Sequence, residues 1–222
     1  MKKIIYIVLT IIAIFSIYID NNIKKYNYVS LTNKIDNNRN YDTYIKEYLI
    51  KNNKLHRFNN FFSNNSNHDL IKDIQNNRTI RIKEEDYYLK KVLRESDIVV
   101  VNVGVERIIK SYDKYDMNKN YRLFDELCIE IESLIKEIRK YAKGDVLLIG
   151  FYNPTNYYDS KTDELFYNTD IKLNSIMEKY SSIYIALYNK IKSNQYKDTK
   201  KPYLLNSYGE RMISDIIEYY LE

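Results

Sequence analysis

Two continuous apolar runs, separated by a long amphipathic segment, constrain the fold of this 222-residue chain more than any other feature. Residues 96–105 read SDIVVVNVGV, and residues 145–154 read DVLLIGFYNP. Such runs are typical of strands that are buried on both faces, as in a parallel sheet. The intervening segment 121–143 carries apolar residues at helical spacing, and Gly144 is a natural helix stop. The order strand, helix, strand predicts a parallel sheet with helices packed against it.

The rest of the chain continues this alternation. Short β-prone runs predict further strands, and apolar residues at helical spacing predict further helices. The expected strands are 26–31, 57–62 and 182–188, and the expected helices are 41–51, 68–75, 87–94, 163–180 and 207–221. We predict an α/β fold, a three-layer α/β/α sandwich whose central parallel sheet has about five strands. Sites in such sheets form at the carboxyl ends of the strands.

The first residues differ in character from everything that follows. Two lysines precede an uncharged, mostly apolar run over residues 4–19, and Asp20 ends it. The run is shorter than the roughly 20 residues of a comfortable membrane span, and no small-x-small cleavage site follows it. We expect residues 1–23 to be an uncleaved signal-anchor in the cell membrane and residues 24–222 to form one extracytoplasmic domain. The alternatives are a cleaved signal peptide, which would make the protein secreted, and a buried core segment.

Composition excludes several classes of site. Four glycines provide no glycine-rich phosphate loop, and one cysteine provides no intramolecular disulfide and no multi-cysteine metal site. We therefore expect no cofactor and no metal ion. The net charge of +5 is spread along the chain and forms no dense basic face, so we expect no nucleic-acid partner. Cys128 falls on the apolar stripe of the helix 121–143 and is predicted to be a core residue.

Histidine chemistry has two candidates, His56 and His68. His68 stands beside Asp69, near the expected end of the second strand. One interpretation is a His–Asp contact or a weak metal site. The other, which we favour, is an exposed residue at a helix N-terminus.

Six short segments follow one another in an order that a known family shares. They are YVSL (28–31), YDTYIKEYL (41–49), DLIKDI (69–74), SDIVVVNVG (96–104), LLIGFYNP (147–154) and NSYGERMI (206–213). Together they resemble the SGNH/GDSL hydrolase family, in particular the extracytoplasmic esterases and lipases of low-GC Gram-positive bacteria. The first segment resembles the strand before the family's nucleophile turn, and the last resembles the N-x-x-G-Y element after its catalytic histidine. The resemblance covers roughly Tyr26–Glu222 and implies the family's α/β fold, in which the parallel sheet has a flavodoxin-like topology.

The family's chemistry implies a serine nucleophile, a histidine base, an aspartate three residues before that histidine, and an oxyanion hole that includes an asparagine amide. The resemblance sets Lys34 at the serine, Asn64 at the second-block glycine, Gly104 and Glu106 at the glycine and asparagine of GxND, Lys201 at the aspartate and Leu204 at the histidine. The serine, asparagine, aspartate and histidine would then all be replaced, and no histidine follows His68. A shifted register would set Ser30 at the nucleophile position, but without a base.

The function that follows is a membrane-anchored, extracytoplasmic SGNH/GDSL-hydrolase-like protein that is catalytically degenerate. It would act as a binding or scaffolding module at the cell surface for a lipid, a cell-wall glycan or another acylated glycan. The candidate ligand-binding residues are Asn33, Asn153, Tyr157 and Tyr203, and a salt bridge between Lys34 and Glu106 is expected to fill the former active site. One alternative is an active SGNH-type esterase or lipase with a non-standard nucleophile and base, and another is an unrelated α/β surface protein. The sequence predicts no oligomeric state.

Overall fold

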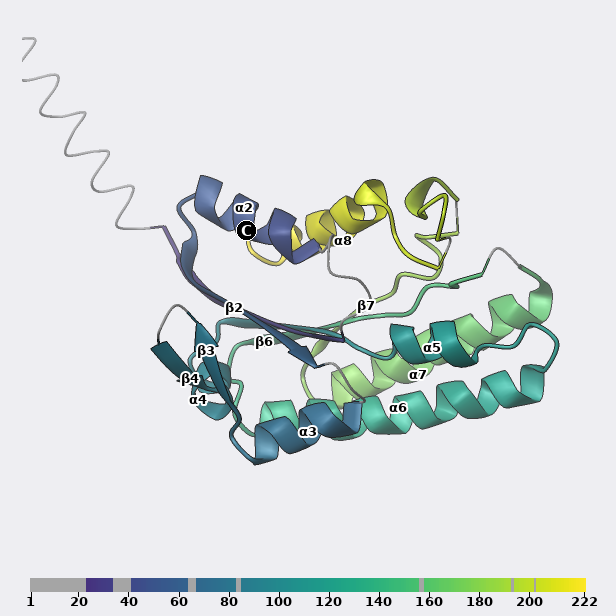
Figure 1. Ribbon diagram of the computed structural model, residues 1–222, viewed down its shortest axis with the longest axis horizontal. Coiled ribbons are helices and arrows are strands. Elements are labelled where there is room, and N and C mark those ends of the chain that lie inside the picture. The colour runs from purple at the N-terminus through teal and green to yellow at the C-terminus, as the bar shows by residue number, and fades with distance from the viewer. Residues whose placement is uncertain are drawn as a thin grey trace, which may run out of the picture.

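A five-stranded parallel sheet forms the middle layer of the protein (Figure 1). The computed structural model describes residues 23–33, 41–63, 67–82, 85–155, 158–192, 194–201 and 203–222. The strands of the sheet are β1 (Tyr26–Asn33), β2 (Leu55–Ser63), β5 (Ile98–Asn102), β6 (Asp145–Ile149) and β7 (Ile183–Ile185). They lie in the order β2-β1-β5-β6-β7, and every neighbouring pair is parallel. The predicted parallel sheet with flavodoxin-like topology is therefore confirmed.

Helices cover both faces of this sheet. They are α2 (Tyr41–Lys51), α3 (Asn67–Gln75), α4 (Leu89–Arg94), α5 (Val105–Ser111), α6 (Met117–Arg139), α7 (Ser160–Lys179) and α8 (Ser207–Tyr219), with a short 3-10 helix η1 (Asn194–Tyr196). In Figure 1, α2 and α8 lie above the sheet, and α3, α6 and α7 lie below it. Helix α6 buries the predicted apolar stripe, and Cys128 on that stripe is 1% exposed, which confirms it as a core residue. The three-layer arrangement is the one predicted.

The two central strands are buried on both faces, as their apolar runs predicted. Residues 98–101 of β5 and 146–149 of β6 are each no more than 1% exposed. Strand β6 is nevertheless shorter than the predicted run 145–154, because its partner β7 pairs with it only over residues 147–149. The run continues as a buried loop through Pro154. Continuous apolarity thus indicated burial correctly but overestimated the length of the strand.

An antiparallel hairpin outside the main sheet is absent from the sequence prediction. Strand β3 (Thr79–Ile82) pairs with β4 (Glu85–Tyr88). The helix expected over 87–94 therefore begins only at Leu89, which is the first residue of α4. Four-residue strands offer too few positions for a period-2 pattern to stand out. The helix α5 was also missed, because its seven residues span too few turns for a helical period to stand out.

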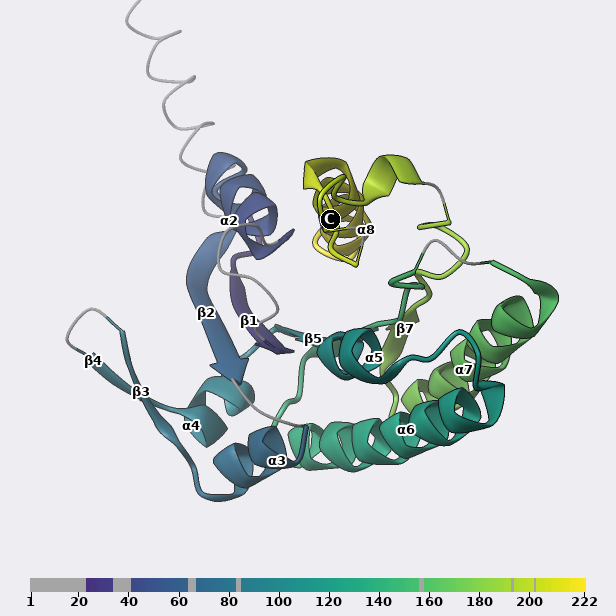
Figure 2. The same cartoon turned by 45° about the vertical axis from the view of Figure 1, so that its right-hand side comes forward.

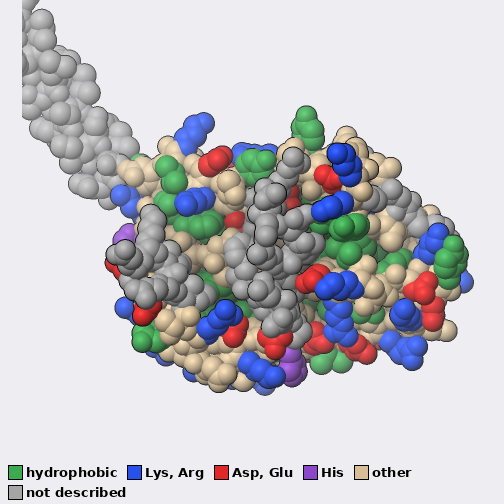
Figure 3. Space-filling model, viewed as in Figure 1, with side chains coloured by type: hydrophobic (Ala, Val, Ile, Leu, Met, Phe, Trp, Pro, Cys, Tyr) green, Lys and Arg blue, Asp and Glu red, His purple; other side chains and the backbone are tan. Residues whose placement is uncertain are grey.

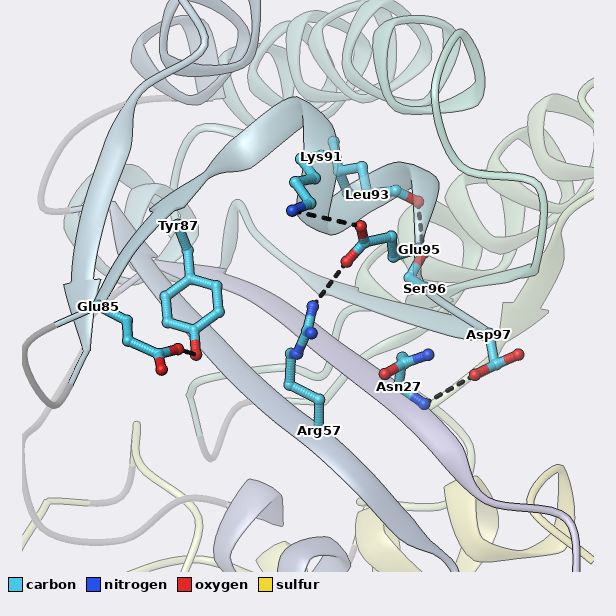
Figure 4. A network of polar contacts seen from close by, with 9 residues as sticks. All are labelled: Asn27, Arg57, Glu85, Tyr87, Lys91, Leu93, Glu95, Ser96 and Asp97. Atoms are coloured by element: carbon cyan, nitrogen blue, oxygen red, sulfur yellow. Dashed lines mark hydrogen bonds and ion pairs between the residues drawn. The ribbon is translucent and has the colours of Figure 1, made fainter.

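Side chains at the amino edge of the sheet hold this hairpin and α4 in place (Figure 4). Arg57 of β2 lies over the ring of Tyr87, with its guanidinium carbon 5.6 Å from the ring centroid, and donates to Glu95 at 2.7 Å. The backbone N–H of Asn27 donates to the Asp97 carboxylate at 2.8 Å. These contacts join β2 to the hairpin and to the end of α4, and β1 to the residue just before β5.

None of the described helices is long and apolar enough to cross a membrane. The predicted signal-anchor 1–23 lies outside the described residues, apart from its last residue. The anchor and the domain boundary therefore stay predictions.

Candidate functional site

The carboxyl ends of β1 and β5 mark the expected place for a site. The strand order reverses there, since β1 is followed in the chain by β2 on one side and has β5 as its neighbour on the other. Ligands of open α/β sheets bind in the crevice at such a topological switch point. Thr32 of β1 and Asn102 of β5 are direct partners in this part of the sheet. Some of the residues singled out by the sequence follow the carboxyl ends of strands, such as Gly104 after β5 and Asn153 after β6.

Gly104 makes the turn from β5 into α5. Its φ of +90° lies in the left-handed region, and a Cβ placed on it would stand 3.0 Å from the ring of Phe151. Both facts require glycine, since other residues are strained at positive φ and the ring leaves no room. The glycine of the sequence motif therefore has a structural reason here.

Glu106 is the second residue of α5, and its carboxylate accepts a hydrogen bond from Lys110 at 2.5 Å. The salt bridge expected between Lys34 and Glu106 cannot be followed, because Lys34 lies outside the described residues. The next residue, Arg107, pairs with Glu126 and Glu130 of α6 and thereby ties α5 to the lower layer. The region of the GxND motif thus presents a carboxylate that one lysine already neutralises.

The loop before α8 contains the positions that the resemblance assigns to the aspartate and the histidine. Lys201 and Leu204 close one turn, in which the Leu204 N–H donates to the Lys201 carbonyl at 2.8 Å. Asp198, which the sequence did not single out, accepts from the backbone N–H groups of Lys200 and Lys201. This carboxylate therefore stabilises the backbone of its own loop.

Asn206 and Gly209 of the N-x-x-G element also serve the local backbone. The Asn206 side chain accepts from the N–H groups of Tyr208 and Gly209, and so caps α8. Its amide donates to the carbonyls of Gln195 and Lys197. A Cβ on Gly209 would stand 2.6 Å from the Tyr196 carbonyl oxygen, so this glycine allows the loop to approach the helix. The element is explained by helix capping and close packing.

Of the four candidate ligand-binding residues, the structure describes Asn33, Asn153 and Tyr203. The Asn153 side-chain oxygen is buried and accepts from the N–H and the hydroxyl of Thr155, both at 2.8 Å. Tyr203 is 37% exposed, and its carbonyl accepts from the hydroxyl of Tyr152 at 2.9 Å. Asn33 is the last residue of β1. Asn64 and Tyr157 lie outside the described residues. The structure therefore brings Tyr203 to the loop that carries Asn153, through Tyr152.

Both histidines are exposed, and they lie in different elements of the fold. His56 is exposed and is the second residue of β2, at the amino edge of the sheet. It is about 20 Å from the carboxyl end of its own strand, at roughly 3.3 Å per residue. His68 is exposed in the first turn of α3, as the favoured interpretation predicted. Within the described residues, no group of three or more His, Cys, Asp or Glu side chains is arranged to hold a metal ion.

A buried polar cluster, which the sequence did not reveal, lies between the sheet and the helices α2 and α8. Its members are Ser30, Thr32, Asn60, Asn102, Tyr28, Tyr41, Asp42 and Glu210. Asp42 accepts from the hydroxyl of Tyr28 and from the amide of Asn60, each at 2.8 Å. Ser30 is fully buried within β1, so the shifted register would place the nucleophile under the helices. Only the residue types of the alternate positions 28, 30 and 32 of β1 hinted at this polar face.

Lys197 is a second buried polar feature near this edge. It is 2% exposed, and its ammonium group donates to the Thr155 carbonyl at 2.6 Å and to the Tyr158 hydroxyl at 3.0 Å. Burial lowers the pKa of this amine to about 8. Lys197 thereby joins the loop before α8 to the loop before α7.

Charges of both signs are mixed over the face shown in Figure 3, where Lys and Arg side chains lie beside Asp and Glu side chains. Among the described residues, ion pairs also join neighbouring helices, such as Lys172 with Asp125 and Lys179 with Glu132. The described side chains on this face therefore mix both signs of charge and form no dense basic stripe.

No family model and no curated protein matches the chain. Solved structures do match it. A lipase from a goat rumen metagenome aligns with a TM-score of 0.68 and 14% identity, over 88% of this chain and 99% of that one. The acetylxylan esterase Axe2 from Geobacillus stearothermophilus aligns with a TM-score of 0.63 and 13% identity, over 90% of this chain and 95% of that one. Its catalytic mutants, in which a serine, an aspartate or a histidine is replaced by alanine, align as well.

The likeness extends over nearly the whole described chain, while the identity stays low. The overall fold is therefore shared, while few residues are identical. The predicted resemblance is confirmed at the level of structure: the chain has the α/β fold of the SGNH-type esterases.

Proposed function

We propose that this protein is a membrane-anchored, extracytoplasmic SGNH-fold protein without the family's catalytic groups, and that it binds an acylated glycan at the cell surface. One observation carries the proposal. The turn before α8 offers an aliphatic side chain, Leu204, where the resemblance calls for the histidine base, and both histidines of the chain lie elsewhere and are exposed. A serine hydroxyl without a base is a poor nucleophile at neutral pH.

The carboxylate at the start of α5 also supports the proposed loss of catalysis. Glu106, at the position of the oxyanion-hole asparagine, is a carboxylate held by Lys110. An oxyanion is stabilised by hydrogen-bond donors, and a carboxylate in their place repels it. Two of the required groups would therefore be replaced by residues of unsuitable chemistry.

The glycan preference rests on the tyrosine and asparagine content of the loops and on the fold. Tyr203 is partly exposed beside the loop of Asn153, and aromatic rings with neighbouring amides suit a neutral, hydroxyl-rich ligand. The esterases with this fold include one named for acetylxylan.

Hydrolysis of a short acyl reporter, p-nitrophenyl acetate, tests the loss of catalysis. The full-length chain should hydrolyse it no faster than the double variant Ser30→Ala, Lys34→Ala. A rate clearly above that of the double variant would support the alternative, an active esterase with a non-standard nucleophile and base.

Binding is tested with a matched pair of probes, an acetylated xylo-oligosaccharide and the same oligosaccharide after chemical deacetylation. We expect saturable binding of the acetylated probe, weakened about tenfold by Tyr203→Ala, and no release of acetate. If neither oligosaccharide binds and the protein binds phospholipid vesicles instead, the ligand is a lipid and not a glycan.

The anchor is tested separately, by fractionation. The protein should stay in the membrane pellet after alkaline carbonate extraction, and its mass should equal that of the uncleaved chain. Protease added to intact cells should digest it. Recovery of a shortened chain from the medium would instead support a cleaved signal peptide and secretion.

A further inference from the structure

Basic side chains gather at the amino edge of the sheet, where the strands begin. The strands are parallel, so the helices between them return in the opposite direction and end at this same edge (Figure 1). We call seven of these side chains the basic edge, and none of the seven forms an ion pair with a described residue. They are Lys24, Lys25, Lys51, Lys54, Lys90, Arg94 and Lys143. Lys54 and Lys90 are half-buried, and the other five are exposed.

The first half of the basic edge lies around the start of β1. The ammonium group of Lys24 lies over the Tyr26 ring, 4.6 Å from its centroid, and the Lys54 carbonyl accepts from the N–H of Tyr26 at 2.7 Å. The Lys54 ammonium group donates to the Leu221 carbonyl at 2.9 Å. The end of the chain after α8 therefore lies beside the end of α2, and both views show these two helices side by side (Figures 1 and 2).

The second half of the basic edge lies around α4. The ammonium group of Lys90 and the guanidinium group of Arg94 lie over the Tyr141 ring, 5.4 and 5.6 Å from its centroid. Asp97 joins the two halves, because its backbone N–H donates to the Asn27 carbonyl and its carboxylate accepts from the Asn27 N–H. The basic edge is thus assembled from separate segments, and only the fold brings them together.

The charge of the domain is therefore unevenly distributed. The chain has 35 basic and 30 acidic residues, and two lysines and one aspartate precede residue 24, so residues 24–222 carry a net charge of +4. The seven charges of the basic edge exceed this value, so the remaining residues of the domain are together net acidic. Nearby carboxylates offset only part of the basic edge: Glu95 already pairs with Arg57 and Lys91, while Asp145 and Glu222 are exposed.

The helix dipole explains only part of this pattern. Basic side chains are favoured in the last turn of a helix, which accounts for Lys51 of α2 and Arg94 of α4. Lys90 lies in the first turn of α4, where the dipole disfavours a positive charge. The remaining four members of the basic edge lie outside the helices. Most of the basic edge therefore suits an external partner of negative charge.

We propose that the basic edge rests on anionic phospholipid headgroups of the membrane that holds the N-terminal segment. This orientation depends on the anchor of the proposed function. Lys24 and Lys25 directly follow the predicted anchor 1–23, and the four residues from Asp20 to Lys24 span at most about 14 Å. The edge is thereby held close to the surface potential of anionic lipids, which attracts lysine and arginine and decays over about 8 Å at physiological salt. Tyr219, at the end of α8, is 73% exposed, and tyrosine is favoured at membrane–water interfaces.

This orientation turns the candidate site away from the bilayer. The amino and carboxyl edges lie at opposite ends of the strands, and the eight residues of β1 span about 25 Å at roughly 3.3 Å per residue. Phospholipids of the same membrane then lie out of reach of the carboxyl edge. The orientation favours a ligand that is presented from outside the membrane, such as a glycan.

Acetylation of individual lysines measures this contact in the full-length chain. The chain is placed in nanodiscs of phosphatidylcholine, with or without phosphatidylglycerol, and treated with the uncharged reagent N-succinimidyl acetate. Mass spectrometry then quantifies each lysine. We expect phosphatidylglycerol to slow the acetylation of Lys25, Lys51 and Lys143 about fivefold. The exposed lysines of the carboxyl edge, Lys161 and Lys190, should react equally in both lipids. Salt at about 1 M should abolish the protection, because it shortens the Debye length to about 3 Å.

A matched pair of variants separates the basic edge from total charge. The double variant Lys25→Gln, Lys51→Gln should weaken the protection of Lys143. The double variant Lys161→Gln, Lys190→Gln removes the same charge from the carboxyl edge and should leave that protection unchanged. If a variant does not fold, the comparison of the two lipids in the unmodified chain decides.

The anchor and the basic edge fail separately in this experiment. Retention in phosphatidylcholine nanodiscs reports the anchor, and the difference between the two lipids reports the basic edge. Equal acetylation in both lipids would overturn the lipid contact, even where the anchor holds. Protection by phosphatidylglycerol without retention in phosphatidylcholine would support the contact and contradict the anchor. Equal protection by soluble glycerophosphate, added to phosphatidylcholine nanodiscs, would overturn the lipid contact and assign the basic edge to a free phosphate.

Discussion

Gly104 lies directly against Phe151: a Cβ on Gly104 would stand 3.0 Å from Cε1 of the Phe151 ring. The ring packs in turn against Phe124 of α6, edge to face, with centroids 5.8 Å apart. Because the ring is held and the φ of Gly104 is +90°, Gly104→Ala should lower the free energy of unfolding by about 2 kcal/mol. Urea denaturation followed by circular dichroism measures this. Thr43→Ala on the exposed face of α2 is the control, and equal stabilities of the two variants would contradict the prediction.

Arg139 should be a main determinant of stability at the end of α6. Its guanidinium donates to the Gly144 carbonyl at 2.6 Å, to the Ser182 hydroxyl at 2.8 Å and to the Ser181 carbonyl. Arg139→Ala should cost about 2 kcal/mol, and Arg139→Lys about half of that, since an ammonium group lacks the planar fork that reaches three acceptors. Thermal unfolding tests both variants against Arg122→Ala, which removes an exposed arginine from the same helix. A loss no larger than that of the control would argue against this role.

Asp170 should make the protein more stable in acid. Burial raises the pKa of this carboxyl from 3.8 to about 6, although the Tyr184 hydroxyl donates to it. The folded state holds the proton more tightly than the unfolded state, so the contribution is complete below about pH 3.8 and is lost as the pH rises to about 6. Asp170→Asn should therefore raise stability at pH 7 by about 1 kcal/mol and flatten the slope between pH 4 and 6. Chemical denaturation across this range measures the slope.

The matched control for that experiment is Asp125→Asn, which removes an exposed partner of Lys172 from α6. Surface ion pairs contribute little, so its slope should equal that of the unmodified chain. An identical pH dependence in Asp170→Asn would mean that Asp170 titrates near its ordinary pKa.

Cys128 should be inert in the folded protein. It is 1% exposed, and burial raises the pKa of its thiol to about 11. A disulfide reagent such as Ellman's should release no chromophore from the folded chain at pH 8 and one equivalent after unfolding in guanidinium. Ser133→Cys, on the exposed face of the same helix, should react with one equivalent while folded. Rapid reaction of the unmodified folded chain would show that α6 opens.

The core of the fold could be read from the sequence because its information is local. The apolar runs 96–105 and 145–154 and the stripe of α6 repeat at the period of the element that they form, and the burial of β5, β6 and Cys128 follows from them. The resemblance to the SGNH family rested separately on six short sequence segments, taken in order along the chain.

What only the tertiary structure decided depends on contacts between distant residues. The β3–β4 hairpin is fixed by Arg57 against Tyr87, where local spacing favoured a helix. The hydrogen bond between Tyr41 and Glu210 joins residues 169 positions apart, and no periodic pattern announces it. Gly104 and Gly209 are explained by the atoms that would meet a Cβ, which belong to other loops and helices. Periodicity in the sequence determined which faces are buried, while the pairing of buried polar groups was decided by where the chain brings them together.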